Sequence, residues 1–388
     1  MTSAIAISGF EPLSSPFTVT SRRGTLDIID LVSDEWRALA EDAVDDQPFY
    51  RPEWIQAHLR LFAPTSRVVL IEVRSAGRLC LLLPLIEERG TFSKVPIRKL
   101  RAPVNVHGGR FDAMRCAGVG GEEAIQAAAN YLLKLESWDV LQLNNTPGQS
   151  TNEQIILSMR GRGIRSLKLN DQPNPLILVP KDHSLLHTMP PNSKLRSQLR
   201  RVRQRLELRG PLRFRREDDA KSTSLERFYK LEASGWKGAA GSAILCNGTR
   251  PFYDEMARAG ARYGYFSLFT LECGGELVAA HYSFTHRDRC YSPIVTYNEA
   301  FRQFAPGHLI ISEILSYCAA NDIQYFDITG QDQPWKMKWT SAARSMNHYF
   351  VFKGPLGQLA YRVGVSFRSA VGISRPSKDG PSHNETLP

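Results

Sequence analysis

The segment 276–339 constrains the fold more than any other part of this chain. Two apolar strand patterns are followed by the turn 302–308 (RQFAPGH), a helical pattern over 309–320 and a strand pattern over 325–329. A turn with a small residue, a proline and a glycine at a helix N-terminus can direct backbone N–H groups at an anion. Because Arg302 adds a cation, the segment predicts an α/β unit with a phosphate-binding turn.

Helical and strand patterns alternate along the whole chain, which favours an α/β or α+β fold with mixed sheets. Residues 26–180 and 181–370 show the same succession of a helical start, an apolar–Gly–apolar hairpin, a helix and a strand. Within the first half, residues 26–31 are expected to form a strand. Prolines between 173 and 191 mark the boundary. The repeat predicts a tandem duplication of one α/β unit.

The two ends of the chain lack an apolar period. Residues 1–25 are expected to form a loose arm, and residues 371–388, which are rich in Pro, Ser, Lys and Gly, a disordered tail.

Composition limits the partners and the chemistry. The net charge of +10 favours an anionic partner such as a membrane surface, a nucleic acid or a phosphorylated cofactor. None of the six cysteines forms a CxxC pair, so we expect free thiols, no metal site and a reducing compartment. No apolar run approaches the roughly 20 residues that span a bilayer, and a cytoplasmic location is expected. The NTPase, serine hydrolase and zincin motifs are absent.

The hairpin, strand, turn, helix and strand of the second half resemble the core of GNAT-type acyltransferases. In that family an Arg/Gln-x-x-Gly-x-Gly/Ala turn holds the pyrophosphate of acyl-CoA. A narrower resemblance is to the Fem-like branch, which includes CelD-like proteins associated with cellulose biosynthesis. It rests on the segments PFYRPEW (48–54), LVAAH (277–281), YN (297–298), APG (305–307) and FDITGQDQPWK (326–336). The resemblance implies two GNAT-like halves with the acyl-CoA site in the second.

The resemblance assigns the cofactor contacts to the turn. It implies that Arg302 and the backbone N–H groups of Ala305, Gly307 and His308 hold the pyrophosphate. Acyl-CoA is the expected co-substrate, with no metal.

Three side chains are candidates for proton transfer. His281 lies in the middle of a strand pattern, and imidazole has a pKa suited to a general base at neutral pH. Glu232 lies at a helix end near an aromatic residue and is an alternative base. Tyr297 closes the strand before the turn and is expected to line the pocket first and to act as an acid second. A structural histidine and a solvated glutamate remain the alternatives.

Five further residues are expected to bind the acceptor. Trp236 and Lys237 follow Glu232 and are expected to shape its pocket. Asp332, Trp335 and Lys336 follow the strand that ends at residue 329; Lys336 is suited to a phosphate or carboxylate, and Asp332 to orienting it. A surface ion pair is the alternative for the last three.

The helical pattern over 193–210 carries seven basic residues and one acidic residue around a narrow apolar stripe. Contact with anionic lipid headgroups and a solvated helix face are both consistent with it. Nucleic acid is disfavoured, because no aromatic residues interleave the cations.

The sequence thus predicts an N-acyltransferase that moves an acyl group from acyl-CoA to a primary amine of an amino sugar, an amino acid or a long-chain amine. Peripheral contact with the inner face of the membrane is expected through the basic helix. Two alternatives stay open: a Fem-like aminoacyl transferase that uses charged tRNA, and a non-catalytic GNAT-like scaffold in polysaccharide biosynthesis or export.

Overall fold

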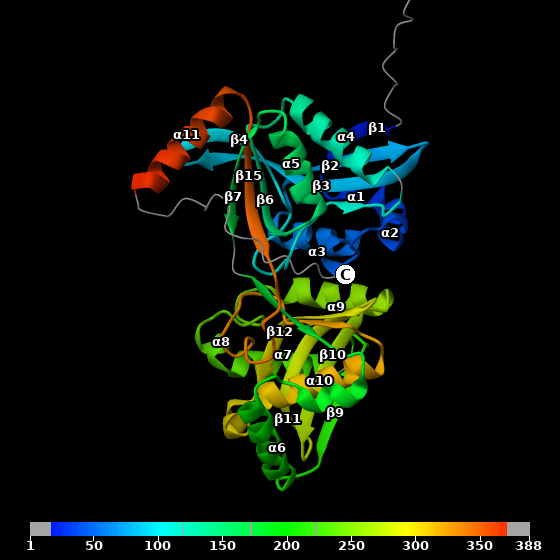
Figure 1. Ribbon diagram of the computed structural model, residues 1–388, viewed down its shortest axis with the longest axis vertical. Helices are drawn as coiled ribbons and strands as arrows, with labels where there is room; N and C mark the ends of the chain where they lie inside the picture. Colours follow the sequence, from blue (N-terminus) through cyan, green and yellow to red (C-terminus); the bar gives the residue numbers. More distant parts are fainter. Residues whose placement is uncertain (1–16, 119, 171–172, 222, 371–388) are drawn as a thin grey trace, which may run out of the picture.

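The computed structural model describes residues 17–118, 120–170, 173–221 and 223–370. Figure 1 shows two halves stacked along the long axis, each built on one mixed sheet with helices on both faces. The predicted α/β class with tandem units is confirmed. The predicted tail, 371–388, lies outside the described residues.

The sheet of the first half begins as an antiparallel series and then gains one parallel neighbour. Its path is β1-β2-β3-β4-β6-β15-β7, with β4 and β6 parallel and all other neighbours antiparallel. The strands are β1 (Phe17–Gly24), β2 (Arg67–Ser75), β3 (Arg78–Phe92), β4 (Val95–Arg101), β6 (Val140–Pro147), β7 (Arg165–Asn170) and β15 (Met346–Phe352), and β5 (Met114–Arg115) pairs with β3.

The sheet of the second half repeats this arrangement. Four antiparallel neighbours, β9 to β12, are followed by β13 parallel to β12 and then by β8 antiparallel to β13, with β14 beyond it. The strands are β8 (Asn174–Leu178), β9 (Leu212–Glu217), β10 (Phe266–Cys273), β11 (Glu276–His286), β12 (Arg289–Tyr297), β13 (Tyr325–Asp327) and β14 (Ala343–Arg344). The repeat of directions strand by strand is what a duplicated unit requires.

The two halves exchange one strand each. β8, which precedes residue 180, completes the second sheet, and β15, near the end of the chain, completes the first. A division at residue 180 therefore places both strands in the wrong unit. The predicted loose arm is also wrong over Phe17–Gly24, which is β1, and the predicted strand 26–31 contains the helix α1 (Asp27–Asp30) instead.

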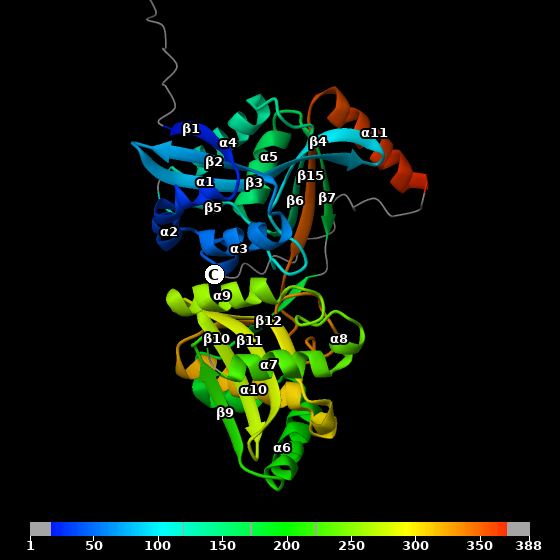
Figure 2. The same cartoon turned by 180° about the vertical axis from the view of Figure 1, so that it is seen from behind.

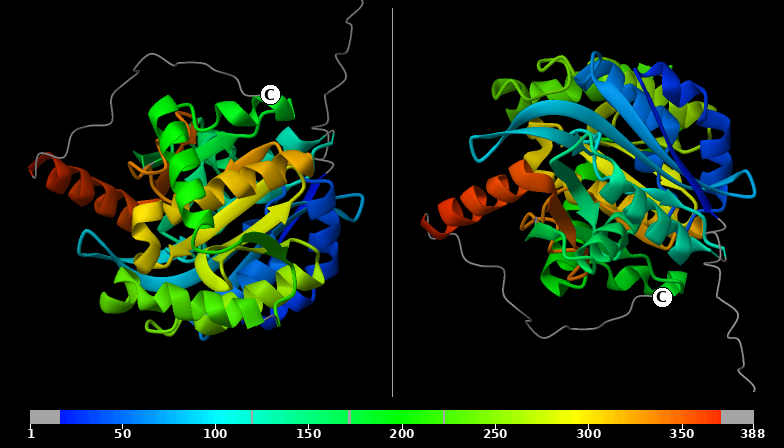
Figure 3. Two further views of the ribbon diagram at one scale, coloured as in Figure 1. Left: turned by 90° about the horizontal axis from the view of Figure 1, so that it is seen from below. Right: turned by 90° about the horizontal axis from the view of Figure 1, so that it is seen from above.

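Helices cover both faces of each sheet. In the second half, α10 (Pro306–Ala320) and α7 (Thr223–Ser234) lie on opposite faces (Figures 1 and 2). α11 (Gly354–Ala370) packs on β4 and β15 and points away from the body (Figure 3). The other helices are α2 (Ser33–Glu41), η1 (Pro48–Tyr50), α3 (Pro52–Phe62), α4 (Gly121–Lys134), α5 (Thr151–Arg160), η2 (His183–Thr188), α6 (Ser193–Glu207), α8 (Trp236–Ala239), α9 (Arg250–Arg262) and η3 (Glu299–Phe304).

One apolar core crosses from the first half into the second. α3 packs against α9, and Trp54 of α3 contacts Phe252 and Phe284 edge-on, with ring centroids 5.6 and 5.2 Å apart. Edge-to-face aromatic pairs add about 0.5–1.5 kcal/mol to the burial of apolar area. The halves are therefore joined by a continuous core as well as by the exchanged strands.

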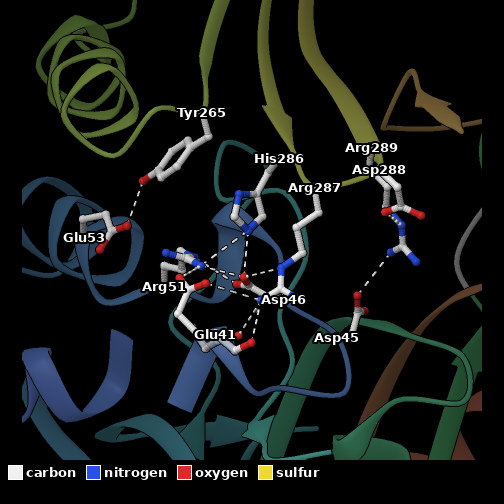
Figure 4. Close-up of polar contacts among 11 residues, drawn as sticks. Glu41, Asp45, Asp46, Arg51, Glu53, Tyr265, His286, Arg287, Asp288 and Arg289 are labelled. Carbon is white, nitrogen blue, oxygen red and sulfur yellow. Dashed lines mark hydrogen bonds and ion pairs between the residues drawn. The ribbon is translucent and has the colours of Figure 1, made fainter. Parts of the chain in front are cut away.

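A polar cluster flanks that core (Figure 4). Asp46 accepts from Arg51 at 2.6 Å, His286 at 2.7 Å and Arg287 at 3.0 Å, so one carboxylate of the first half binds the last residue of β11 and the arginine that follows it. Asp45 pairs with Arg289 at 3.1 Å. The first half supplies most of the carboxylates in this cluster, and the second half most of the cationic side chains.

Candidate functional site

A cavity of about 510 Å³ opens where β12 and β13 separate. The two strands pair through only three residues each, Arg289–Tyr291 against Tyr325–Asp327. Beyond these pairs the later residues of β12 line one side of the cavity, and residues 328–330 line the other. A divergent pair of parallel strands leaves a free backbone edge, which is a suitable place to bind an extended ligand.

Ten of the predicted site residues line this cavity, although they are spread over about a hundred positions of the chain. They are Glu232, Lys237, His281, Tyr297, Arg302, Ala305, Gly307, His308, Trp335 and Lys336. Trp236 is the first residue of α8, and its side chain lies outside the described residues. Asp332 is half-buried in the loop after β13, close enough to affect Lys336 electrostatically.

The predicted anion-binding turn adopts the expected position at the start of α10. Ala305 is the N-cap residue with φ 50° and ψ 50°, and Pro306 occupies the first helical position, where its missing N–H costs nothing. A left-handed backbone is unfavourable for alanine by roughly 1–2 kcal/mol. The fold thus holds a strained residue at the mouth of the cavity.

The backbone donors of the turn are fewer than predicted. The N–H of Ala305 donates to the carbonyl of Arg302 at 3.0 Å, and the N–H of His308 donates to the carbonyl of Ala305 at 2.9 Å. Within the described residues, the N–H of Gly307 has no acceptor. The prediction that all three N–H groups face an anion is therefore corrected: the turn offers the Gly307 N–H, the positive end of the α10 dipole and the exposed Arg302.

His308 is held in one tautomer. Its Nδ1 accepts a hydrogen bond from Nε1 of Trp339 at 2.9 Å, which leaves the proton on Nε2. Burial, with a smaller contribution from Lys338, lowers the pKa of His308 to about 4. Its imidazole is therefore neutral at neutral pH and can donate from Nε2.

His281 is fully buried and neutral. Its Nδ1 lies 3.1 Å from Oγ of Ser292, which in turn bonds Ser283 at 2.6 Å. Burial first, and the charge of Lys237 second, lower the pKa of His281 to about 3. An imidazole with this pKa is a weak base at neutral pH, so the geometry favours a positioning role.

Glu232 and Lys237 form an ion pair at the cavity wall. Oε1 of Glu232 lies 3.4 Å from Nζ of Lys237, and its Oε2 accepts the backbone N–H of Ile244 at 2.9 Å. Lys237 also donates to the carbonyl of Val295 at 3.2 Å. Since that carbonyl points to the cavity edge of β12, the N–H of Val295 points to the same edge.

Tyr297 lies beside the turn. A Cβ atom added to Gly307 would be 3.8 Å from Cδ1 of Tyr297. Burial, together with the nearby Glu299, raises the pKa of Tyr297, so its hydroxyl stays protonated and able to donate at neutral pH.

Thr329 and Gly330 are site residues that were not predicted from the sequence. They line the cavity and both have positive φ, 45° and 62°. Positive φ at a β-branched residue such as Thr329 is a rare conformation. A threonine-glycine pair directly after a strand was the available signal, since glycine favours such turns.

The basic helix α6 has a buried and an exposed face. Leu195, Leu199, Val202 and Leu206 pack into the second-half core, and Arg205 and Arg209 lie over the ring of Phe304 at 5.6 and 5.1 Å. Phe304 belongs to the turn, so the cationic face adjoins the cavity mouth.

Within the described ranges, no group of three His, Cys, Asp or Glu side chains could hold a metal ion. None of the helices in those ranges combines the length and apolar character needed to cross a bilayer.

The family model of the acetyltransferase (GNAT) domain matches residues 193–337, which contain the cavity, the turn and all the predicted site residues. No curated protein sequence matches the chain.

Solved structures extend the similarity to both halves. The crystal structure of FemX is 12% identical with a TM-score of 0.57, over 85% of this chain and 98% of FemX. A conserved protein from Bacteroides thetaiotaomicron is 10% identical with a TM-score of 0.53, over 87% and 100% of the two chains. The C-terminal domain of a putative lysylphosphatidylglycerol synthetase from Agrobacterium fabrum is 10% identical with a TM-score of 0.50, over 88% and 96%. At these identities the similarity shows a shared fold.

Proposed function

We propose that this Fem-like protein, whose residues 193–337 are a GNAT domain, transfers an acyl group from acyl-CoA to a primary amine. The observation that supports this most is the composition of one cavity. Its wall includes the N-terminus of a 15-residue helix, the guanidinium of Arg302 and the carboxylate of Glu232. Groups that can bind the phosphates of acyl-CoA and a base that can deprotonate an amine thus line the same cavity.

In this proposal the pyrophosphate lies at the Gly307 N–H and Arg302, and the acyl arm runs along the free edge of β12. The N–H of Val295 polarises the thioester carbonyl as negative charge develops on its oxygen. Glu232 is favoured as the base over His281, because His281 has a pKa near 3.

The reaction is a direct displacement. Glu232 removes one proton from the acceptor ammonium, and the amine nitrogen attacks the thioester carbon. The attack forms the C–N bond. The tetrahedral intermediate collapses with cleavage of the C–S bond, and its second amine proton passes to water, from which Tyr297 regains the proton that it gives to the leaving thiolate. Tyr297 donates a proton to the departing thiolate, which leaves as free thiol.

Release of free thiol from acyl-CoA in the presence of primary amines, with mass spectrometry of the amide product, tests this function. Glu232→Gln keeps the bond to Ile244 and is expected to lower kcat by roughly 10²–10⁴-fold. Glu226→Gln, on the same helix but half-exposed and paired with Arg250, is the matched control and should leave kcat unchanged.

If Glu232→Gln turns over like the wild type, Glu232 is not the base and another residue must have that role. No thiol release from any acyl-CoA, combined with transfer from aminoacyl-tRNA, would favour the aminoacyl transferase alternative. Neither activity would favour the scaffold.

We also propose that the exposed face of α6 contacts anionic lipid headgroups. Lys194, Arg200 and Arg201 are exposed, and Leu208 at the helix end is 88% exposed, so an apolar side chain is available beside cations. Each basic residue near an anionic surface contributes about 1 kcal/mol.

Co-sedimentation with phosphatidylglycerol vesicles tests this contact. The double variant Arg200→Glu/Arg201→Glu should lose binding, whereas the control Arg160→Glu/Arg162→Glu, on exposed residues of the first half, should not. If both variants bind vesicles like the wild type, the lipid contact is wrong. Salt-sensitive tRNA binding that only the α6 variant loses would instead assign the face to nucleic acid.

A further inference from the structure

Lys336 is a buried cation that faces the cavity without a carboxylate partner. Its side chain lies in the loop after β13, and the residue is 6% exposed. Its Nζ donates to the carbonyl of Thr329 and lies 5.6 Å from the ring centroid of Trp335. Within the described residues, no ion pair involves Lys336, so two of the three N–H donors of its ammonium group have no protein partner here.

Neither of the two acidic side chains near Lys336, Asp327 and Asp332, forms an ion pair with it. Asp327 forms a buried ion pair with Arg110 at 2.8 Å, and Asp332 attracts Lys336 electrostatically but forms no ion pair with it. The pKa of Lys336 is lowered to about 8, because burial outweighs the attraction of both carboxylates. Lys237, across the same cavity, is different: its charge is balanced by Glu232 at 3.4 Å.

The backbone around Lys336 is shaped to receive its ammonium group. A Cβ atom added to Gly330 would lie 3.3 Å from Nζ of Lys336, so glycine leaves the necessary room. Thr329, with φ 45°, is fixed by a bond from its N–H to Asp327 at 2.9 Å and by one from its hydroxyl to the carbonyl of Ser292 at 3.3 Å. The strained backbone of Thr329 is held by these bonds, so the carbonyl that accepts from Lys336 has a fixed position. The ammonium group of Lys336 is therefore preorganised, unlike that of a mobile surface lysine.

A second side chain supports the same loop. With its amide oriented to satisfy both neighbours, Asn174 of β8 donates to the carbonyl of Gly330 at 2.8 Å and accepts from Arg110 at 3.1 Å. The exchanged strand and the first half thus hold the loop that presents Lys336.

We propose that the acceptor of the acyl group carries an anionic group, a carboxylate or a phosphate, and that the ammonium of Lys336 binds it. The inference rests on the proposed acyl transfer and names the class of its acceptor: an amine with a nearby acidic group. A buried charge without a partner is unfavourable, so an anion that enters the cavity gains a charge-assisted hydrogen bond that a neutral acceptor lacks.

The test compares matched acceptors at saturating acyl-CoA. An amino acid is paired with its carboxamide, and an amino sugar phosphate with the unphosphorylated amino sugar; the two pairs separate the carboxylate from the phosphate. The wild type should prefer the anionic member of one pair by about 10- to 100-fold in kcat/KM. In Lys336→Met, the KM of that anionic acceptor should rise by a similar factor, while the neutral acceptor and the affinity for acyl-CoA change by less than about threefold.

Lys338→Met is the control, because Lys338 is an exposed lysine two residues away. It should keep the wild-type preference. Equal preference for both members of each pair in the wild type would overturn the inference. So would a loss of kcat in Lys336→Met that is the same for anionic and neutral acceptors, since that result would place the lysine at the reacting carbonyl.

A second measurement does not depend on turnover, so the inference and the proposed function can fail separately. Acetate and inorganic phosphate are titrated as probes against the thermal unfolding of the full chain. Because the turn at Gly307 and Arg302 is also expected to attract anions, the proteins are compared with one another: one of the probes should raise Tm more in the wild type and in Lys338→Met than in Lys336→Met. Equal behaviour of the wild type and Lys336→Met toward both probes would contradict the anion site even if acyl transfer is found.

Discussion

The two halves have the same strand arrangement but differ at the helix that follows the fourth antiparallel strand. In the first half this helix is α4, which starts after Gly120 with φ 96° and has Glu122 and Glu123 in its first turn. In the second half it is α10, which starts after Ala305 and has no acidic residue there. Carboxylates near a helix N-terminus satisfy its positive end. The α4 terminus is therefore already neutralised, whereas the α10 terminus is available to an anion.

The two helix starts also differ in how far side chains cover them. A Cβ atom added to Gly121 would lie 2.2 Å from Nη1 of Arg115, so a side chain covers the start of α4. A Cβ added to Gly307 would meet only Tyr297, at 3.8 Å, and the cavity lies beyond it. The start of α10 is thus open to the cavity, whereas the start of α4 is covered by a side chain.

The largest expected effect concerns the last pair of parallel strand residues, where the two halves differ most in charge. In the second half this pair is Tyr291 and Asp327; in the first half it is Arg101 and Gln142. Asp327→Asn leaves the guanidinium of Arg110 buried and unpaired and should lower the free energy of unfolding by about 3–5 kcal/mol, measured by urea denaturation.

Gln142→Ala is the matched change in the first half, and we expect it to cost less than about 1 kcal/mol because Gln142 is half-buried and no charge is left unpaired. Equal losses of unfolding free energy in Asp327→Asn and Gln142→Ala would show that no unpaired buried charge distinguishes the second half from the first.

The next largest effect concerns the polar cluster between the halves, to which the first half contributes most of the carboxylates and the second half most of the cationic side chains. Burial raises the pKa of Asp46, but the hydrogen bonds from His286 and Arg51 outweigh it and lower this pKa to about 2. Since the folded pKa is below the unfolded value of 3.8, the stabilisation is present above pH 4 and is lost as the pH falls through 2. The expected loss is roughly 2 kcal/mol.

Urea denaturation of the wild type and Asp46→Asn between pH 5 and 2 measures this loss. The variant should start less stable and lose less stability on acidification. As a control, Asp42→Asn, in an exposed pair with Arg78, should follow the wild-type pH dependence. Parallel curves for the wild type and Asp46→Asn would mean that this cluster does not titrate on folding.

The smallest effect concerns the N-cap residues of α4 and α10. Ala305→Gly removes the strain of a left-handed alanine, roughly 1–2 kcal/mol, but adds about 0.4–1 kcal/mol of unfolded-state entropy. We expect a net stabilisation of about 0.5 kcal/mol. Gly120→Ala should destabilise, because its Cβ would lie 2.9 Å from Cζ of Phe17 at φ 96°. Destabilisation by Ala305→Gly would contradict the left-handed N-cap.

The sequence predicted the duplicated unit, the turn and ten residues that share the cavity, because periodicity and local turn chemistry are encoded in neighbouring positions. It did not predict that β8 and β15 change partners, since strand pairing between distant segments leaves no local pattern. The ion pair between Arg110 and Asp327 was not predicted for the same reason, because the two residues are 217 positions apart. The segment 26–31 (LDIIDL) was too short to distinguish a strand from a helix. The engaged N–H groups of Ala305 and His308 depend on dihedral angles that residue types alone do not determine.

Isothermal titration of acyl-CoA into the full-length chain tests the central claim that the α10 terminus of the second half binds the co-substrate. Gly307→Asp should keep the fold, because an acidic residue in the first turn stabilises a helix, and its carboxylate should weaken binding by about 100-fold or more. Gly307→Asn, of the same size but neutral, should weaken it far less, and Glu122→Gln at α4 should not change it. Unaltered affinity in Gly307→Asp, or equal losses in the aspartate and asparagine variants, would contradict the account.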